Sequence, residues 1–149
     1  MTTNSVTLHR VLKTNPEKVY RAFSEPNALA AWLPPYGFLC TVHEMDFCVD
    51  GSYKMSFTNF STGNGHSFGG KFLEIKPNEF IKHTDIFDDP NLRGEINTTI
   101  WIAKVSCGTE LKIVQEGIPS VIPTEMCYLG WQESLEKLSK LVEPEIPDA

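Results

Sequence analysis

The side chains in this sequence that titrate near neutral pH belong to four histidines, His9, His43, His66 and His83. His43 precedes Glu44, and His83 stands two residues before Asp85, so either pair could supply a general base and the carboxylate that orients it. On a β-strand, His83 and Asp85 would share one face. Because this spacing is also common by chance in strands, the sequence favours histidines that simply hydrogen bond or face solvent.

Other groupings of reactive side chains give no catalytic motif. The carboxylates Asp88 and Asp89 fall in a predicted loop, and Glu143 and Glu145 fall at the C-terminal end, where solvated charges are the rule. The pair at residues 69–70 (Gly-Gly) lies inside a predicted strand and indicates a β-bulge rather than a phosphate-binding loop. Without a nucleophile elbow, a P-loop or a dinucleotide fingerprint, the sequence assigns no catalytic residue and no cofactor.

The cysteines indicate the redox environment. The four are Cys40, Cys48, Cys107 and Cys127. They form no C-x-x-C pair and stand at no zinc-ligand spacing from the histidines, so no metal site is predicted. The first ten residues, MTTNSVTLHR, are polar and lack the apolar run of a signal peptide. We therefore expect a cytoplasmic protein with reduced, mostly buried thiols.

Length and charge narrow the classes of partner. A chain of 149 residues, 41% of them hydrophobic, fits one domain with its own core. The formal net charge of -6 argues against nucleic acid and against an anionic membrane surface. No apolar stretch approaches the roughly 20 residues that span a bilayer, so no membrane insertion is expected.

The N-terminal third must provide one strand and two short helices. Residues 5–13 alternate apolar and polar side chains, which predicts a strand. Asn15 can cap a helix that begins at Pro16 and runs to Phe23. A second short helix reaches Trp32 and is stopped by the Leu-Pro-Pro of residues 33–35.

The rest of the chain predicts a sheet followed by one long helix. Alternating patterns predict strands at residues 38–46, 52–59, 66–75, 80–87, 95–105 and 109–116. Residues 124–142 carry an apolar stripe at spacings of three and four, made of Tyr128, Trp131, Leu135, Leu138 and Val142. We expect an α+β fold in which a curved antiparallel sheet of six or seven strands wraps the C-terminal helix. Residues 1–143 would form the domain and residues 144–149 a flexible tail.

Four segments resemble motifs of one family. They are PEKVYRAFSEPNALAAWLPP at 16–35, GGKFLEIKPNEFIKHT at 69–84, CGTELKIVQEGIP at 107–119 and GWQESLEKLSKLV at 130–142. In this order they resemble the START-like, SRPBCC superfamily, in the branch named after activators of the heat-shock-protein ATPase. The resemblance implies a helix-grip fold, like that of the birch-pollen allergen, with a cavity between sheet and long helix. The superfamily includes lipid carriers, hormone receptors, polyketide aromatases and cyclases, and chaperone cofactors, so fold alone does not choose among them.

One segment departs from that family. Members typically read Asp-x-Arg-x-Gly-Gly before the third strand, whereas residues 46–51 read DFCVDG here. The missing arginine removes an anchor for an anionic ligand or a structural salt bridge, so no relative's specificity can be transferred to this chain.

Strand parity predicts which side chains face the cavity. The expected ligand-binding residues of the cavity wall are Phe57, Phe87, Ile100, Ile102 and Met126. Trp32 and Phe38 are expected at its mouth, where the short helices meet the sheet. Phe68 and Phe72 stay undecided, because a bulge at residues 69–70 would swap their faces. Trp131 is expected in the core rather than against a ligand.

Three functions follow from this reading. The first is binding of a small hydrophobic ligand, such as a lipid, an aromatic polyketide or a flavonoid-like molecule. The alternative is an aromatase or cyclase that uses the same cavity, which needs a buried polar group from among His83, Asp85 and Gln115. A second alternative is stimulation of a chaperone ATPase, with the chaperone as partner.

Overall fold

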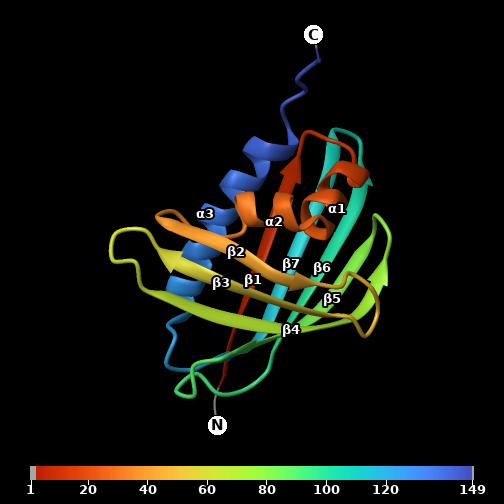
Figure 1. Cartoon of the computed structure of the whole chain (residues 1–149). Coiled ribbons are helices and arrows are strands. Elements are labelled where there is room, and N and C mark those ends of the chain that lie inside the picture. The colour runs from red at the N-terminus through yellow and green to blue at the C-terminus, as the bar shows by residue number, and fades with distance from the viewer. Residues whose placement is uncertain (1–2, 149) are drawn as a thin grey trace.

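The computed structural model describes residues 3–148 and contains ten helices and strands (Figure 1). The helices are α1 (Pro16–Ser24), α2 (Pro26–Trp32) and α3 (Thr124–Val142). The strands are β1 (Thr3–Leu12), β2 (Phe38–Met45), β3 (Ser52–Asn59), β4 (Gly65–Lys76), β5 (Phe80–Phe87), β6 (Ile96–Val105) and β7 (Gly108–Pro119). The sequence-predicted ranges agree with these bounds to within three residues at each end. None of the helices described is long and apolar enough to cross a membrane.

The seven strands form one antiparallel sheet in the order β1-β7-β6-β5-β4-β3-β2. The sheet curves strongly, so that β2, β3 and β4 cross in front of β1, β7 and β6 in Figure 1. Helix α3 packs against β1, while α1 packs against β6 and α3, and α2 packs against β2 and α3. The predicted α+β architecture, a curved sheet around a long C-terminal helix with two short helices after the first strand, is confirmed.

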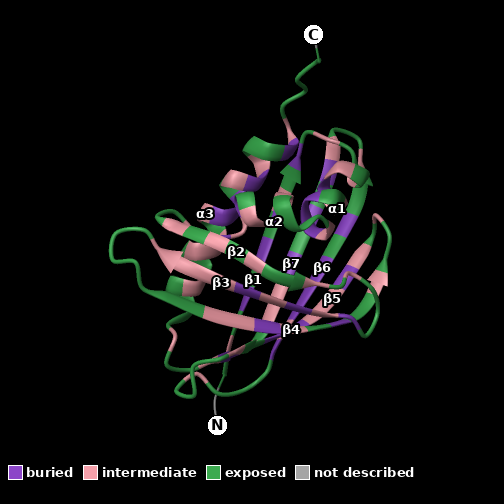
Figure 2. Ribbon diagram, in the orientation of Figure 1, coloured by how far each residue is buried: buried purple, intermediate pink, exposed green. Residues whose placement is uncertain are grey.

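Local sequence explains the helix ends. The Asn15 side chain accepts a hydrogen bond from the Lys18 backbone N–H at 2.8 Å, and Pro16 occupies the first turn of α1. In α3, the buried members of the apolar stripe are Leu135, Leu138 and Val142, which face the sheet. Figure 2 shows buried and exposed positions alternating along β1, β6 and β7, as expected when one face of a strand points into the core and the other toward solvent.

The bulge predicted at residues 69–70 is wrong, because the register of β4 with β3 is continuous there and the register with β5 is the same at Gly69 as at Phe72. The register shifts further along, between Phe72 and Glu74. Gly70 is needed for another reason: a Cβ at this position would lie 1.8 Å from the Thr84 carbonyl oxygen. Since no bulge separates Phe68 from Phe72, both share one parity, and both line the cavity described below.

Candidate functional site

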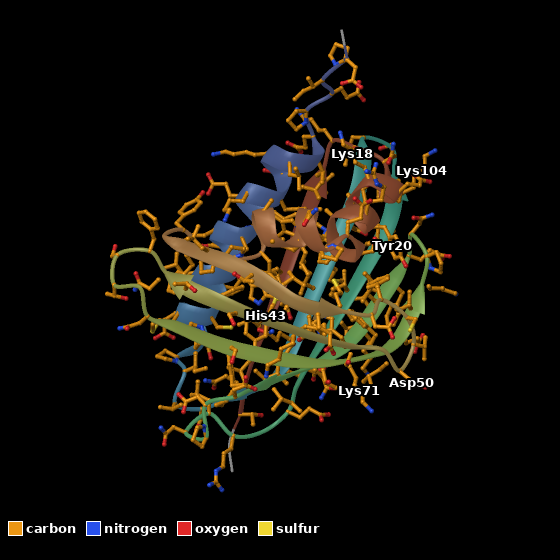
Figure 3. All side chains as sticks on the ribbon, viewed as in Figure 1. Lys18, Tyr20, His43, Asp50, Lys71 and Lys104 are labelled. Atoms are coloured by element: carbon orange, nitrogen blue, oxygen red, sulfur yellow. The ribbon has the colours of Figure 1, made fainter. Side chains whose placement is uncertain are left out.

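A cavity of about 290 Å³ lies between the concave face of the sheet and α3. Its wall is largely apolar and includes aromatic rings in edge-to-face contact: the centroids of Phe57 and Phe68 are 5.1 Å apart, and those of Phe47 and Phe72 are 4.8 Å apart. Tyr20 of α1, labelled in Figure 3, packs edge-on against Phe47 at 5.7 Å. The volume falls at the lower end of the range for small-molecule pockets, about 300–1,000 Å³.

The predicted ligand-binding residues divide into two groups. Those that line the cavity are Phe57, Phe87, Ile100 and Met126, the last at its rim with 65% of its surface exposed. Those that lie outside the lining are Trp32, Phe38 and Ile102.

Each residue outside the lining has another role in packing. Trp32 is fully buried, and its indole N–H donates to the Ala22 carbonyl oxygen at 2.8 Å. The Phe38 ring packs against His66 with centroids 6.2 Å apart. Ile102 is buried on β6, the strand against which α1 packs. Parity fixes the face of a strand, but it does not say how far along that face the cavity extends.

A buried carboxylate stands on the cavity wall. Asp85 of β5 accepts hydrogen bonds from the Tyr53 hydroxyl and from the Thr98 hydroxyl, the latter at 2.6 Å. Nδ1 of His83 lies 3.2 Å from Asp85 Oδ1. Three side chains from β3, β5 and β6 therefore surround one carboxylate, and all four residues line the cavity.

The hydrogen bonds continue across the wall to α3. The Thr98 hydroxyl accepts from the Gln115 side-chain N–H at 3.2 Å. Gln115 Oε1 in turn accepts from the Trp131 indole N–H at 3.0 Å and from the Cys127 thiol at 3.5 Å. We call the set Tyr53, His83, Asp85, Thr98, Gln115, Cys127 and Trp131 the polar chain.

The sequence named only part of the polar chain. His83, Asp85 and Gln115 were the expected candidates, and each lines the cavity. Tyr53 and Thr98 were missed, although the period of two along a strand puts them on the same faces as Phe57 and Ile100, which were predicted to face inward. The signal that could have identified them is a polar side chain at an inward-facing position, because a buried polar group must have a hydrogen-bond partner.

Charge on the polar chain is set by the pair His83 and Asp85. Burial alone lowers the pKa of His83, but the neighbouring Asp85 carboxylate reverses this and holds the pKa above its usual value of 6.5. Burial alone raises the pKa of Asp85, but His83, Thr98 and Tyr53 together hold it below 3.8. Burial and the Asp85 charge raise the pKa of Tyr53 strongly, so its hydroxyl stays protonated and donates.

One ring nitrogen of His83 has no partner among the described residues. Nδ1 of His83 faces Asp85 and the Thr84 carbonyl oxygen, whereas Nε2 has no hydrogen-bond partner in the part of the chain that the structure describes. No buried side-chain nitrogen or oxygen of residues 3–148 lacks a partner, so Nε2 is not sealed by protein atoms. His83 lines the cavity, with its ring centroid 5.5 Å from Tyr53 and 5.9 Å from Phe72. It is a hydrogen-bonding group on a cavity wall made mostly of apolar side chains.

The raised pKa of His83 predicts how stability depends on pH. Because the pKa of His83 is higher in the folded protein than in the unfolded chain, protonation of His83 favours the folded state. This stabilisation is complete below the unfolded-state pKa of about 6.5, and it is lost as the pH rises through the folded-state pKa. The free energy of unfolding of the wild type should therefore decline above about pH 6.5 relative to His83→Gln. Urea unfolding of both proteins between pH 5.5 and pH 8.5 (roughly the range of histidine titration) tests this, and parallel curves would contradict it.

Gly130 occupies an unusual place in α3. It lines the cavity in the middle of the helix, and a Cβ built on it meets no atom within 4 Å. Glycine in a helix interior costs about 1 kcal/mol relative to alanine. Gly130→Ala should therefore raise the free energy of unfolding by about 0.5–1 kcal/mol in urea titrations. A loss of stability would mean that the helix needs the bare backbone at this position.

Metal and disulfide chemistry find no support in residues 3–148. The part of the chain that the structure describes contains no group of three or more His, Cys, Asp or Glu side chains that could hold a metal ion. The four cysteines are free thiols, but the expectation that most are buried is wrong, because Cys48 and Cys107 are exposed and Cys40 and Cys127 are half-buried. Partial burial raises the pKa of Cys40 to about 11 and that of Cys127 above its usual value.

A curved antiparallel sheet around a long C-terminal helix, with a cavity between them, defines the class of helix-grip proteins. Residues 13–143 match the family Activator of Hsp90 ATPase homolog 1-like protein, and the chain belongs to this family. No curated protein matches it.

Solved structures of similar chains agree with this assignment. Protein CV1439 from Chromobacterium violaceum is 58% identical with a TM-score of 0.94, over 95% of this chain and 99% of that one. Two further structures share the fold. The AHSA1 protein from Silicibacter pomeroyi has 20% identity and a TM-score of 0.78, over 92% of this chain and 96% of that one. The AHSA1-like protein from Aeromonas hydrophila has 18% identity and a TM-score of 0.76, over 94% and 92%.

Proposed function

We propose that the protein binds a small hydrophobic molecule in the cavity between the sheet and α3. The observation that carries the proposal is the aromatic wall: Phe57, Phe68 and Phe87 line the space and are only partly buried by other protein atoms. Unfilled apolar space of this kind lowers stability, because the lining loses contacts that a filled core would have. A ligand would restore those contacts.

The size of the cavity favours a compact ligand. Its volume of about 290 Å³ lies at the lower end of the range for small-molecule pockets, about 300–1,000 Å³. Two fused aromatic rings are compact and present flat faces to the surrounding rings. An extended acyl chain fits less well, so among the expected ligand classes the aromatic ones are preferred over lipids.

A thermal-shift screen with small aromatic compounds tests the proposal. A ligand at a hundred times its dissociation constant should stabilise the fold by about 2.7 kcal/mol. Phe68→Trp fills part of the cavity and should abolish the shift. The matched control is Phe60→Trp, because Phe60 is 76% exposed and lies outside the lining. Equal shifts in the two variants, or no shift in the wild type with any compound, would remove the proposal.

A second candidate is an aromatase- or cyclase-type enzyme that uses the same cavity. The observation in its favour is the pair His83 and Asp85, which forms an oriented acid–base group with Nε2 uncovered on an apolar wall. If the protein is such an enzyme, His83→Gln should keep ligand binding and lose turnover by about 10²–10⁴-fold. Binding without any turnover by the wild type would leave only the first candidate.

The family's name gives a third candidate, stimulation of an Hsp90-type ATPase. Its test is the ATPase rate of a purified chaperone with and without this protein. An unchanged rate at saturating protein would exclude it.

A further inference from the structure

We propose that the ligand carries a hydroxyl group on its aromatic system, a phenol or an enol, and that this hydroxyl pairs with Nε2 of His83. The inference rests on the proposed function, because it assigns the chemistry of the molecule that fills the same cavity. It makes His83 the residue that selects among aromatic compounds of equal size.

The position of the His83 ring is fixed by its contact with Asp85. Its carboxylate partner, Asp85, is itself held by the hydroxyls of Tyr53 and Thr98 on the neighbouring parts of the sheet. Because Nδ1 lies 3.2 Å from that carboxylate, Nδ1 carries a proton in both the neutral and the charged imidazole. The protonation state therefore changes only Nε2, the nitrogen that is free for a ligand.

A hydroxyl is the group that suits Nε2 in both states. Neutral His83 offers a lone pair at Nε2, and a ligand hydroxyl can donate to it. Charged His83 offers an N–H there, and the oxygen of the same hydroxyl can accept. A ketone can only accept, so it pairs with the charged form alone. A hydroxyl also enters the cavity uncharged, so no ionic group has to lose its water beside the aromatic wall.

The cavity should bind a hydroxylated aromatic molecule more tightly than an aromatic hydrocarbon of the same size. The His83 side chain is only 17% exposed, and the rings of Tyr53 and Phe72 flank it. A ligand without a polar group would cover Nε2 and leave it unpaired, which weakens binding by about tenfold or more. The cavity should therefore discriminate against molecules that match it in shape alone.

Three probes with the same ten-carbon bicyclic frame separate these effects. They are naphthalene, 1-tetralone, in which one ring is saturated and carries a carbonyl acceptor, and 1-naphthol, which adds a hydroxyl to naphthalene. We expect the wild type to bind 1-naphthol about tenfold or more tighter than naphthalene, and tighter than 1-tetralone. The dissociation constants would be measured by isothermal titration calorimetry at one pH and salt concentration.

Variants assign the effect to the histidine. His83→Phe keeps a flat ring and should bind all three probes with nearly the affinity of naphthalene. The matched control is His43→Phe, because His43, labelled on β2 in Figure 3, is exposed and outside the lining. This control should keep the wild-type preference for 1-naphthol.

A spectroscopic readout does not depend on stability. At a pH that leaves His83 neutral, excited 1-naphthol in a cavity closed to bulk water can pass its proton to Nε2, so naphtholate emission from the bound probe reports an adjacent Nε2. The wild type should show it and His83→Phe should not. If His83→Phe fails to fold, 1-methoxynaphthalene on the wild type replaces the comparison, since it keeps the oxygen and loses the hydroxyl proton.

The outcomes separate this inference from the function on which it rests. Equal affinity of the wild type for naphthalene and 1-naphthol, or equal weakening of all three probes in His83→Phe, would overturn the hydroxyl and leave the aromatic cavity standing. Failure of all three probes to bind the wild type would overturn the proposed cavity function, and the inference with it.

Discussion

Replacing Asp85 by alanine is expected to lower the free energy of unfolding by about 3–5 kcal/mol. The Asp85 side chain is only 12% exposed and accepts from the hydroxyls of Tyr53 and Thr98, with His83 beside it. Its removal would leave buried donors without partners and the histidine without its counter-charge, and each unpaired group costs about 1–3 kcal/mol. Urea unfolding followed by fluorescence measures the loss.

The matched control for this prediction is Asp88→Ala. Asp88 lies three residues away at the surface, where it pairs with Lys54, and its side chain is 46% exposed. Exposed ion pairs contribute about 0–1 kcal/mol, so this variant should stay close to the wild type. If Asp85→Ala cost no more than Asp88→Ala, the polar chain would not be a buried, interdependent network.

Replacing Trp32 by alanine should cost a similar amount, about 3–5 kcal/mol. The indole is fully buried, packs edge-on against Phe23 at 4.9 Å, and donates to the Ala22 carbonyl oxygen. Truncation would open a large void between α1 and α2 and leave that carbonyl without its partner. Thermal and urea unfolding both report the change.

The location of Trp32 also predicts what its loss would not do. Because Trp32 lies outside the cavity lining, Trp32→Phe should bind aromatic probes with wild-type affinity while losing stability. Trp101→Ala is the control of equal size, since Trp101 is 40% exposed beneath Lys112 and should cost far less. If Trp32→Phe lost affinity for the aromatic probes, Trp32 would belong to the ligand site, as the sequence analysis had predicted.

The fold was predictable because its signals are local. Asn15 and Pro16 predict the start of α1, and an apolar stripe predicts α3. Leu135 and Leu138 of that stripe are buried in the structure. The period of two along β3 places Tyr53, Met55 and Phe57 on one face, and all three line the cavity. Such patterns depend on neighbours within a few residues, and a single sequence contains them.

The site was less predictable because its members meet only in three dimensions. The polar chain joins residues of β3, β5, β6, β7 and α3, and no local pattern states that Gln115 will reach Trp131. The glycines at residues 69–70 indicated a bulge, but they mark close backbone contacts, such as the one between Gly70 and Thr84. The sequence around Ile102 also does not indicate that the cavity ends before this position of β6.

The pairing of β1 with β7 has a consequence for how the protein is made. Leu12 at the end of β1 pairs with Thr109 at the start of β7, so the first strand has no partner in the sheet until nearly a hundred further residues have been added. A ribosome adding about 5–20 residues per second needs roughly 5 to 20 s for this. During that interval the apolar face of β1 stays uncovered, and an uncovered apolar strand is prone to aggregation. Final folding would then follow release of α3, which packs against the same strand.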